Sequence, residues 1–314
     1  MIGRLALTRS AARKRRSDPF GRATAIAAGV APLLVVLIVI VIAQQAAPAI
    51  QGYGWAFLVH TAWNPVTMNF GALPFIYGTV ATSFIALLIA LPVGVGVAVF
   101  LAEPGAARLR GAIGIGVELL AAIPSVVYGI WGLYVLAPWL LTHVDRPVSA
   151  RFGSLAIFEG PARQTSVFAA GIVLAVMILP TLAAVSREVI RAVPGGLRES
   201  GVALGATWWE TTWRLVLRAA RPGIFGATVL AFGRALGETV AVTMVIGNRP
   251  EIRAAIFAPG YTLASVIANE FTEATGRLYP AALLELGLVL LLVTLVVNVG
   301  ALLMVRVVGR DVQA

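Results

Sequence analysis

Long apolar runs separated by short polar segments dominate the pattern of this chain. Six runs reach the length of about 18 residues with few charges that lets a helix cross a bilayer. They lie at 23–47, 73–101, 112–141, 166–185, 223–247 and 280–305. The pattern therefore predicts an all-α integral membrane protein with six transmembrane helices.

The first run follows a basic segment at 13–16, as the core of a secretory signal does. It is longer than the core of about 7–15 residues that is typical of a cleaved signal peptide. Pro48 also lies inside the small-residue site at 47–49, which makes a poor cleavage site. We therefore expect an uncleaved anchor helix.

Composition supports a membrane protein and removes several classes of chemistry. Hydrophobic residues make up 59% of the chain and charged residues 12%, whereas soluble domains average about 25% charged residues. The chain has no cysteine, which excludes disulfides and thiolate metal sites. His60 and His143 lie far apart and show no metal-ligand spacing. We expect no metal and no cofactor.

The distribution of arginine and lysine predicts the orientation in the membrane. If the N-terminus is cytoplasmic, seventeen of these residues lie in cytoplasmic segments, six lie on the other side, and Arg234 lies within a span. Cytoplasmic loops carry such an excess of positive charge, so both termini are expected inside the cell. The net charge of +10 is then mainly an orientation signal with contact to anionic membrane lipid. Nothing else in the chain suggests a nucleic-acid partner.

One polar interruption, at 187–222, differs from the other loops. It carries six arginines, three glutamates and the pair Trp208 and Trp209. Pro194 and the glycines after it end the fourth helix. The alternation of apolar and charged residues then allows two short amphipathic helices, with a sharp turn between them at Gly205. Periodicity leaves two interpretations open, a docking surface for a soluble partner or an interfacial hairpin without one.

Within this interruption, the spacing of Glu199, Gly205 and Leu215 resembles the EAA loop of ABC-importer permeases. The departures from the family pattern are Ser200 and Gly201 for two alanines, Leu215 for isoleucine and Arg218 for proline. The resemblance implies a type I (MetI-like) permease fold with cytoplasmic coupling helices. It assigns the contact with an ATPase to Glu199, Ser200, Gly201, Gly205 and Leu215. The implied organisation is a basic tail at 1–22, an anchor and external segment at 23–72, a permease core at 73–306 and a tail at 307–314.

Two further motifs narrow the resemblance. The third run contains AIPSVVYGIWGL at 122–133, and the fifth contains GRALGETVAV at 233–242. Both resemble the permeases of phosphate (Pst) importers, and the second is similar to their PstC type. That resemblance implies inorganic phosphate as substrate and three protein partners. The partners are a PstA-type permease, a PstB-type ATPase dimer and a PstS-type external phosphate-binding protein.

Arg234 and Glu238 are the ionisable pair of the fifth run. On a continuous helix, residues four apart share a face and can pair. Ionisable groups at membrane depth are costly and usually face a bundle interior or a watery path, and an arginine fork matches phosphate oxygens. The pair is either part of an anion path, with Thr239 and Ser125 beside it, or a structural ion pair. Pro124 either opens the third helix locally or only kinks it.

No G-x-x-x-x-G-K-[ST] sequence occurs in the chain, so ATP binding by a P-loop is not expected here. The chain is predicted to be a transport subunit rather than an enzyme, with ATP hydrolysis in a separate ATPase. Three alternatives stay open. They are a permease for sulfate or molybdate, a gradient-driven secondary anion transporter, and a membrane scaffold without flux.

Overall fold

The structure is a computed structural model and describes residues 19–103 and 107–310. Most of the predicted basic tail, at 1–18, and the end of the C-terminal tail, at 311–314, lie outside the described residues. Within these described residues, six helices are long and apolar enough to cross a membrane, which confirms the predicted number. They are Ile26–Tyr53, Leu73–Ala102, Ser125–Phe152, Val167–Arg191, Trp208–Leu236 and Leu278–Met304.

The core of the bundle is formed by α3 (Leu73–Ala102), α8 (Val167–Arg191) and α11 (Leu217–Leu236). Small residues bring α3 and α8 close together. A Cβ at Gly94 would lie 2.9 Å from Leu182 Cδ2, so that the Leu182 side chain or the helices would have to shift. Such small residues are typical of helix contacts in membranes, where dispersion replaces the hydrophobic effect as the driving force.

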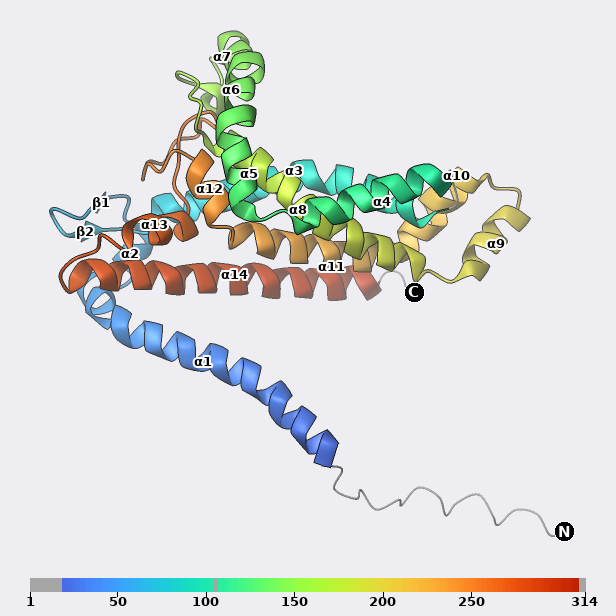
Figure 1. The fold of residues 1–314 in the computed structure, drawn as a ribbon, viewed down its shortest axis with the longest axis horizontal. Helices are drawn as coiled ribbons and strands as arrows, with labels where there is room; N and C mark the ends of the chain where they lie inside the picture. The colour runs from blue at the N-terminus through green and yellow to red at the C-terminus, as the bar shows by residue number, and fades with distance from the viewer. Residues whose placement is uncertain (1–18, 104–106, 311–314) are drawn as a thin grey trace.

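The first and last helices, α1 (Pro19–Tyr53) and α14 (Leu278–Arg310), contact each other. Figure 1 shows α1 diverging from the bundle toward its N-terminal end. Its apolar side chains are largely exposed in this chain, Leu33 by 57% and Ile38 by 56%. Apolar side chains of this kind suit contact with lipid tails or with another helix.

Short elements close the end of the bundle at which α1 meets α14 (Figure 1). Aromatic rings cluster there, and Trp63 Nε1 and Tyr279 Oη donate to the Glu270 carboxylate at 2.8 and 2.7 Å. The elements at this end are α2 (Ala56–Val59), β1 (Trp63–Asn64), β2 (Asn69–Phe70) and α13 (Leu263–Glu270). The two strands are antiparallel, with Trp63 opposite Phe70.

The predicted third span was placed wrongly. Residues 107–122 form a separate helix, α4 (Ala107–Ala122), which packs along α8, and the spanning helix begins only at Ser125. Pro124 is extended, with φ −60° and ψ 144°, and a proline disfavours helix at the residue before it. The chain is therefore interrupted rather than kinked, and the next helix turns away from α4 (Figure 1). That helix consists of α5 (Ser125–Trp131), η1 (Gly132–Leu136), α6 (Ala137–Leu140), η2 (Leu141–Asp145) and α7 (Arg146–Phe152), and η3 (Ala156–Phe158) follows it.

The fifth span also differs from its prediction at both ends. The helix begins at Trp208, as α10 (Trp208–Thr211) and η4 (Thr212–Val216), and runs into α11 without a break. It ends at Leu236, and a separate helix, α12 (Val240–Val245), follows. Hydropathy placed the start late because the first turns carry arginines, although helix formation depends on backbone hydrogen bonds and caps rather than on apolar character.

Candidate functional site

The two sequence motifs of the third and fifth spans lie against each other. Glycines make the approach possible, since a Cβ at Gly129 of α5 would lie 3.1 Å from the Ala241 Cα of α12. A Cβ at Gly132 would lie 3.1 Å from Val245 Cγ2. The fold therefore brings together residues that are more than a hundred positions apart in the chain.

Arg234 lies in the last turn of α11, and its side chain is exposed in this chain. Its Nη1 donates to Thr181 Oγ1 of α8 at 3.3 Å. The guanidinium therefore lies against α8 at the end of α11. In α5, the Tyr128 hydroxyl donates to the Leu120 carbonyl at 2.8 Å.

The predicted pairing of Arg234 with Glu238 is wrong. Among the ion pairs of residues 19–103 and 107–310, none joins these two side chains. The helix ends at Leu236, so Glu238 lies beyond it, and its Oε1 accepts from the Ala241 N–H at 3.4 Å. The i,i+4 argument needs a continuous helix, and the chain leaves the helix at Gly237.

The other two predicted pathway residues, Thr239 and Ser125, lie on different elements. Thr239 follows Glu238 directly, and its hydroxyl donates to the Gly237 carbonyl at 3.3 Å. Ser125 is the first residue of α5 and is half-buried. It precedes Tyr128 by three positions, so the two share a face of α5. Glu238 and Thr239 are neighbours in the chain, and α12, which follows them, packs against α5, which begins at Ser125.

The predicted turn in the polar interruption is confirmed at Gly205. It ends α9 (Gly195–Ala203) with φ +83°, a left-handed conformation that glycine adopts without steric cost. The Ala206 N–H donates to the Gly201 carbonyl at 3.1 Å and the Gly205 N–H to the Val202 carbonyl at 2.9 Å. These two bonds form a Schellman cap.

The second amphipathic helix of the interruption begins as predicted but does not stay short. Thr207 and Glu210 cap its first turn reciprocally, since the Thr207 N–H donates to Glu210 Oε2 at 2.9 Å and the Glu210 N–H to Thr207 Oγ1 at 3.3 Å. Such a capping box satisfies two N–H groups of the first turn. The helix then continues into the membrane span as α11.

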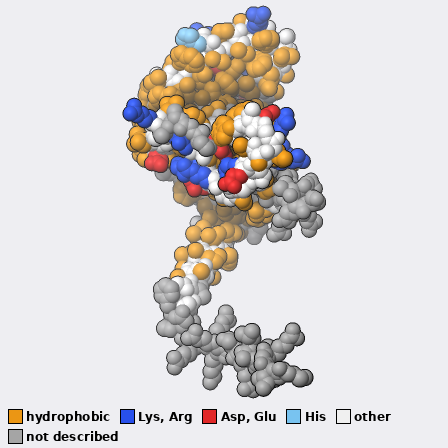
Figure 2. Space-filling model, turned by 90° about the vertical axis from the view of Figure 1, so that its right-hand side faces the viewer, with side chains coloured by type: hydrophobic (Ala, Val, Ile, Leu, Met, Phe, Trp, Pro, Cys, Tyr) orange, Lys and Arg blue, Asp and Glu red, His pale blue; other side chains and the backbone are white. Residues whose placement is uncertain are grey.

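The residues assigned to ATPase contact gather around α9. Glu199 and Ser200 are exposed on it, and Gly201, Gly205 and Leu215 line a groove between α9 and η4. Gly201 is buried and leaves no room for a side chain, since a Cβ there would lie 2.7 Å from Thr211 Oγ1. Figure 2 faces this end of the molecule and shows basic and acidic side chains around it.

An ion pair that the sequence did not predict anchors α9. Arg198 Nη2 lies 3.0 Å from Oε1 of Glu103, whose side chain is only 1% exposed. Arg198 also donates to the Val193 carbonyl at 2.8 Å and to the Ile190 carbonyl at 2.9 Å. One side chain therefore ties α9 to the ends of α3 and α8. A lone glutamate after an apolar run was the only signal in the sequence, and its partner lies 95 positions away.

Known proteins share both the sequence and the fold of this chain. Residues 90–314 match the family described as binding-protein-dependent transport system inner membrane component. The phosphate transport system permease protein PstC of Mesorhizobium japonicum is 47% identical over 267 residues, which cover 83% of this chain and 82% of that protein. The protein of the same name from Haemophilus influenzae is 40% identical over 290 residues, which cover 91% and 92%.

Two solved transporters show the fold. A chain of the inward-facing MetNI methionine ABC transporter matches with a TM-score of 0.55 at 19% identity, over 74% of this chain and 94% of that one. A chain of a bacterial ABC transporter that imports the polysaccharide alginate matches with a TM-score of 0.55 at 18% identity, over 92% and 97%. The protein is thus a multi-pass membrane protein with the MetI-like permease fold. It belongs to the family of inner membrane components of binding-protein-dependent transport systems, as one of the PstC-type permeases of ABC transporters.

Proposed function

We propose that this chain is the transmembrane permease subunit of an ATP-driven importer of inorganic phosphate. In this proposal it forms the anion pathway together with a second, PstA-type permease chain. The observation that carries it is the position of Arg234, an exposed guanidinium at the end of α11 with no carboxylate paired to it among the described residues. The relatives that bear the PstC name support phosphate as the anion.

Arg234 has the chemistry that a phosphate path needs. A guanidinium has five N–H donors in a planar fork that matches two oxygens of a phosphate, and the bond to Thr181 uses one of them. Glu238 lies one helix turn beyond in sequence and bonds to the backbone of α12 instead. Its negative charge near the path keeps the affinity for an anion low enough for release, which is what conduction requires.

The energy for import enters at α9. A PstB-type ATPase dimer docks on the surface of Glu199, Ser200, Gly201, Gly205 and Leu215, and hydrolysis of ATP takes place in that separate subunit. Because Arg198 links α9 to Glu103 and to the end of α8, a displacement of α9 is transmitted to the two central helices. This end and both termini face the cytoplasm, and the opposite end faces a PstS-type phosphate-binding protein.

Sulfate and molybdate satisfy the same guanidinium chemistry, so the anion itself requires a test. The test is uptake of radioactive phosphate into proteoliposomes that contain this chain, the second permease, the ATPase and the binding protein. Uptake of the radioactive phosphate is expected to require ATP. An excess of unlabelled phosphate should reduce this uptake, whereas sulfate or molybdate should not. Arg234→Gln should abolish uptake with the complex still assembled. Arg151→Gln, an exposed arginine of α7, serves as the matched control and should leave uptake unchanged.

Two outcomes contradict the proposal. Uptake by this chain alone that follows an ion gradient and ignores ATP would establish secondary transport. Normal phosphate uptake in the Arg234→Gln complex would remove this side chain from the pathway.

A further inference from the structure

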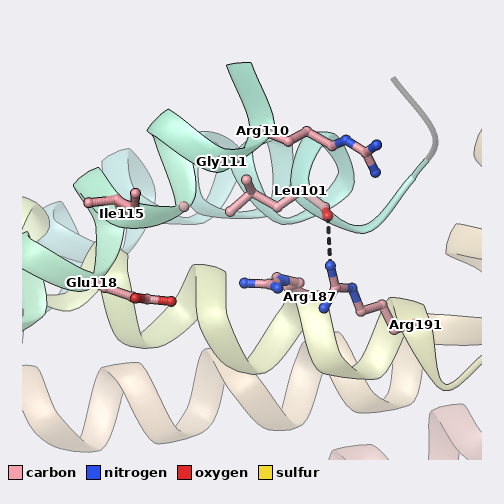
Figure 3. Close-up of a pocket in the computed structure, with 8 residues that line it drawn as sticks. Leu101, Arg110, Gly111, Ile115, Glu118, Arg187 and Arg191 are labelled. Atoms are coloured by element: carbon pink, nitrogen blue, oxygen red, sulfur yellow. Dashed lines mark hydrogen bonds between the residues drawn. The ribbon is translucent and has the colours of Figure 1, made fainter. Parts of the chain in front are cut away.

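A cationic cavity lies between α4 and α8 (Figure 3), at the end of the bundle that also carries α9 (Figure 1). Its volume is about 300 Å³, and a water occupies about 30 Å³ in the liquid, so it has room for a small hydrated anion. Arg110 of α4 and Arg187 and Arg191 of α8 line it, together with Glu118 of α4. Gly111 and Gly114 leave the α4 side of the cavity open.

The arginines are oriented by backbone carbonyls. Arg191 Nη2 donates to the Leu101 carbonyl at 3.2 Å (Figure 3), and Arg110 Nη1 donates to the Glu103 carbonyl at 3.2 Å. A carbonyl fixes a guanidinium in place but, unlike a carboxylate, leaves its full charge. The Arg191 guanidinium is therefore a cation held at the wall of the cavity.

The carboxylate next to the α8 arginines balances them only weakly. Glu188 Oε1 lies 3.8 Å from both Arg187 Nε and Arg191 Nη1, and its side chain is 70% exposed. Exposed ion pairs of this length contribute little to stability, because solvent screens them. Arg187 Nε is in addition buried without a hydrogen-bond partner, and buried donors are normally satisfied. A ligand with acceptor oxygens in the cavity would supply what this donor lacks.

Glu118 specifies the ligand further. Figure 3 shows the Arg187 guanidinium directed along the cavity toward the side of Glu118, and no ion pair within 4.0 Å joins the two in the described part of the chain. A carboxylate only accepts hydrogen bonds. A ligand between these groups must therefore accept from arginine and donate to glutamate. A phosphate that keeps one proton does both, whereas sulfate and the phosphodiester of a lipid have no proton to donate.

We propose that this cavity is a second anion site, which binds protonated inorganic phosphate on the side to which the permease releases it. The statement that this is the side of release rests on the proposed function. The binding chemistry of the cavity does not depend on it. Phosphate held by Arg187, Arg191 and Glu118 joins α4 to α8 and resists their separation. The site is distinct from the pathway region around Arg234, which lies at the end of α11 against Thr181 of α8.

The test is equilibrium binding of radioactive phosphate to the full chain in phosphatidylcholine nanodiscs, with Arg234→Gln as background to remove binding at the pathway. The double substitution Arg187→Gln and Arg191→Gln is expected to weaken binding at least tenfold. The matched control Arg218→Gln, at an exposed arginine of α11, should bind as the background does. In Glu118→Gln, sulfate should begin to compete with phosphate. The glutamine amide can donate a hydrogen bond, so the ligand no longer needs a proton of its own to donate.

Size-exclusion profiles and circular dichroism establish that each variant is folded. If the double variant does not fold, the competition of sulfate in Glu118→Gln still tests the proposal. Glu118 is exposed, so its substitution should not prevent folding. Unchanged phosphate binding in the folded double variant, or unchanged exclusion of sulfate in Glu118→Gln, overturns the proposal. So does displacement of phosphate by phosphatidylglycerol in the nanodisc, which would assign the cavity to a lipid headgroup. Failure of the importer function would appear separately, as absent uptake by the complete complex with this binding intact.

Discussion

The ion pair between Arg198 and Glu103 is expected to decide whether α9 stays docked to the membrane helices. Glu103 is enclosed at the end of α3, and Arg198 is 26% exposed. Replacing Arg198 by alanine removes the guanidinium and leaves a buried carboxylate without its partner. Breaking one side of a buried pair costs about 3–5 kcal/mol, which corresponds to a factor of about 10²–10⁴ in the docked population of α9.

Substitution of the other partner, Glu103, should be less destabilising. Glu103→Gln retains an oxygen that accepts from Arg198, and Arg198 keeps its bonds to the Val193 and Ile190 carbonyls. The lost charge leaves a neutral hydrogen bond, so the expected cost is about 1 kcal/mol. A double variant, Arg198→Ala with Glu103→Ala, should be more stable than Arg198→Ala alone, because it no longer buries an unpaired charge.

Thermal unfolding of the detergent-solubilised chain measures these costs, with tryptophan fluorescence as the signal. Trp208, Trp209 and Trp213 lie close to α9 and report on its surroundings. Retention of the ATPase during purification measures the consequence for docking. Arg218→Ala, at an exposed arginine, is the control. An Arg198→Ala variant with the same unfolding midpoint and the same ATPase retention as the control would refute the reasoning.

Three further substitutions test the local arguments. Gly205→Ala places an alanine in the left-handed conformation at a cost of about 1–2 kcal/mol, although its Cβ would meet no atom within 4 Å. ATPase retention should fall, and unchanged retention would show that the cap is dispensable. Glu199→Arg should release the ATPase at an unaltered unfolding midpoint, since Glu199 is exposed, and continued retention would place docking elsewhere. Gly129→Val should separate α5 from α12, because its Cβ would lie 3.1 Å from the backbone Cα of Ala241. Uptake should be lost while the complex assembles, and normal uptake would mean that this contact does not position the pathway.

Local signals in the chain predicted the parts of the fold that depend on neighbouring residues. Six long apolar runs were enough to predict six spans, because crossing a bilayer demands only length and low polarity. The left-handed turn at Gly205 was likewise predictable, since few other residues adopt that conformation. The same local signals failed where helices begin and end. Pro124 interrupts the third apolar run, so the spanning helix begins later than predicted. The arginines before Gly223 lowered the hydropathy of a segment that is already helical from Trp208.

The error at Arg234 and Glu238 has the same origin. Spacing by four residues implies a shared face only if the helix continues, and the end of α11 at Leu236 places Glu238 in another environment. Arg234 was nevertheless identified correctly as a polar group within a span, and its neighbour turned out to be Thr181 of α8.

The sequence by itself determined the class of protein, the number of spans and the identity of the polar interruption, because each depends on composition or on residues close together in the chain. Only the tertiary structure decided that Glu103 anchors Arg198, that α5 meets α12 at two glycines, and that Arg110 joins Arg187 and Arg191 around one cavity. These groupings join segments far apart in the sequence. They follow from how helices pack in three dimensions, and no periodicity within a single helix carries that information.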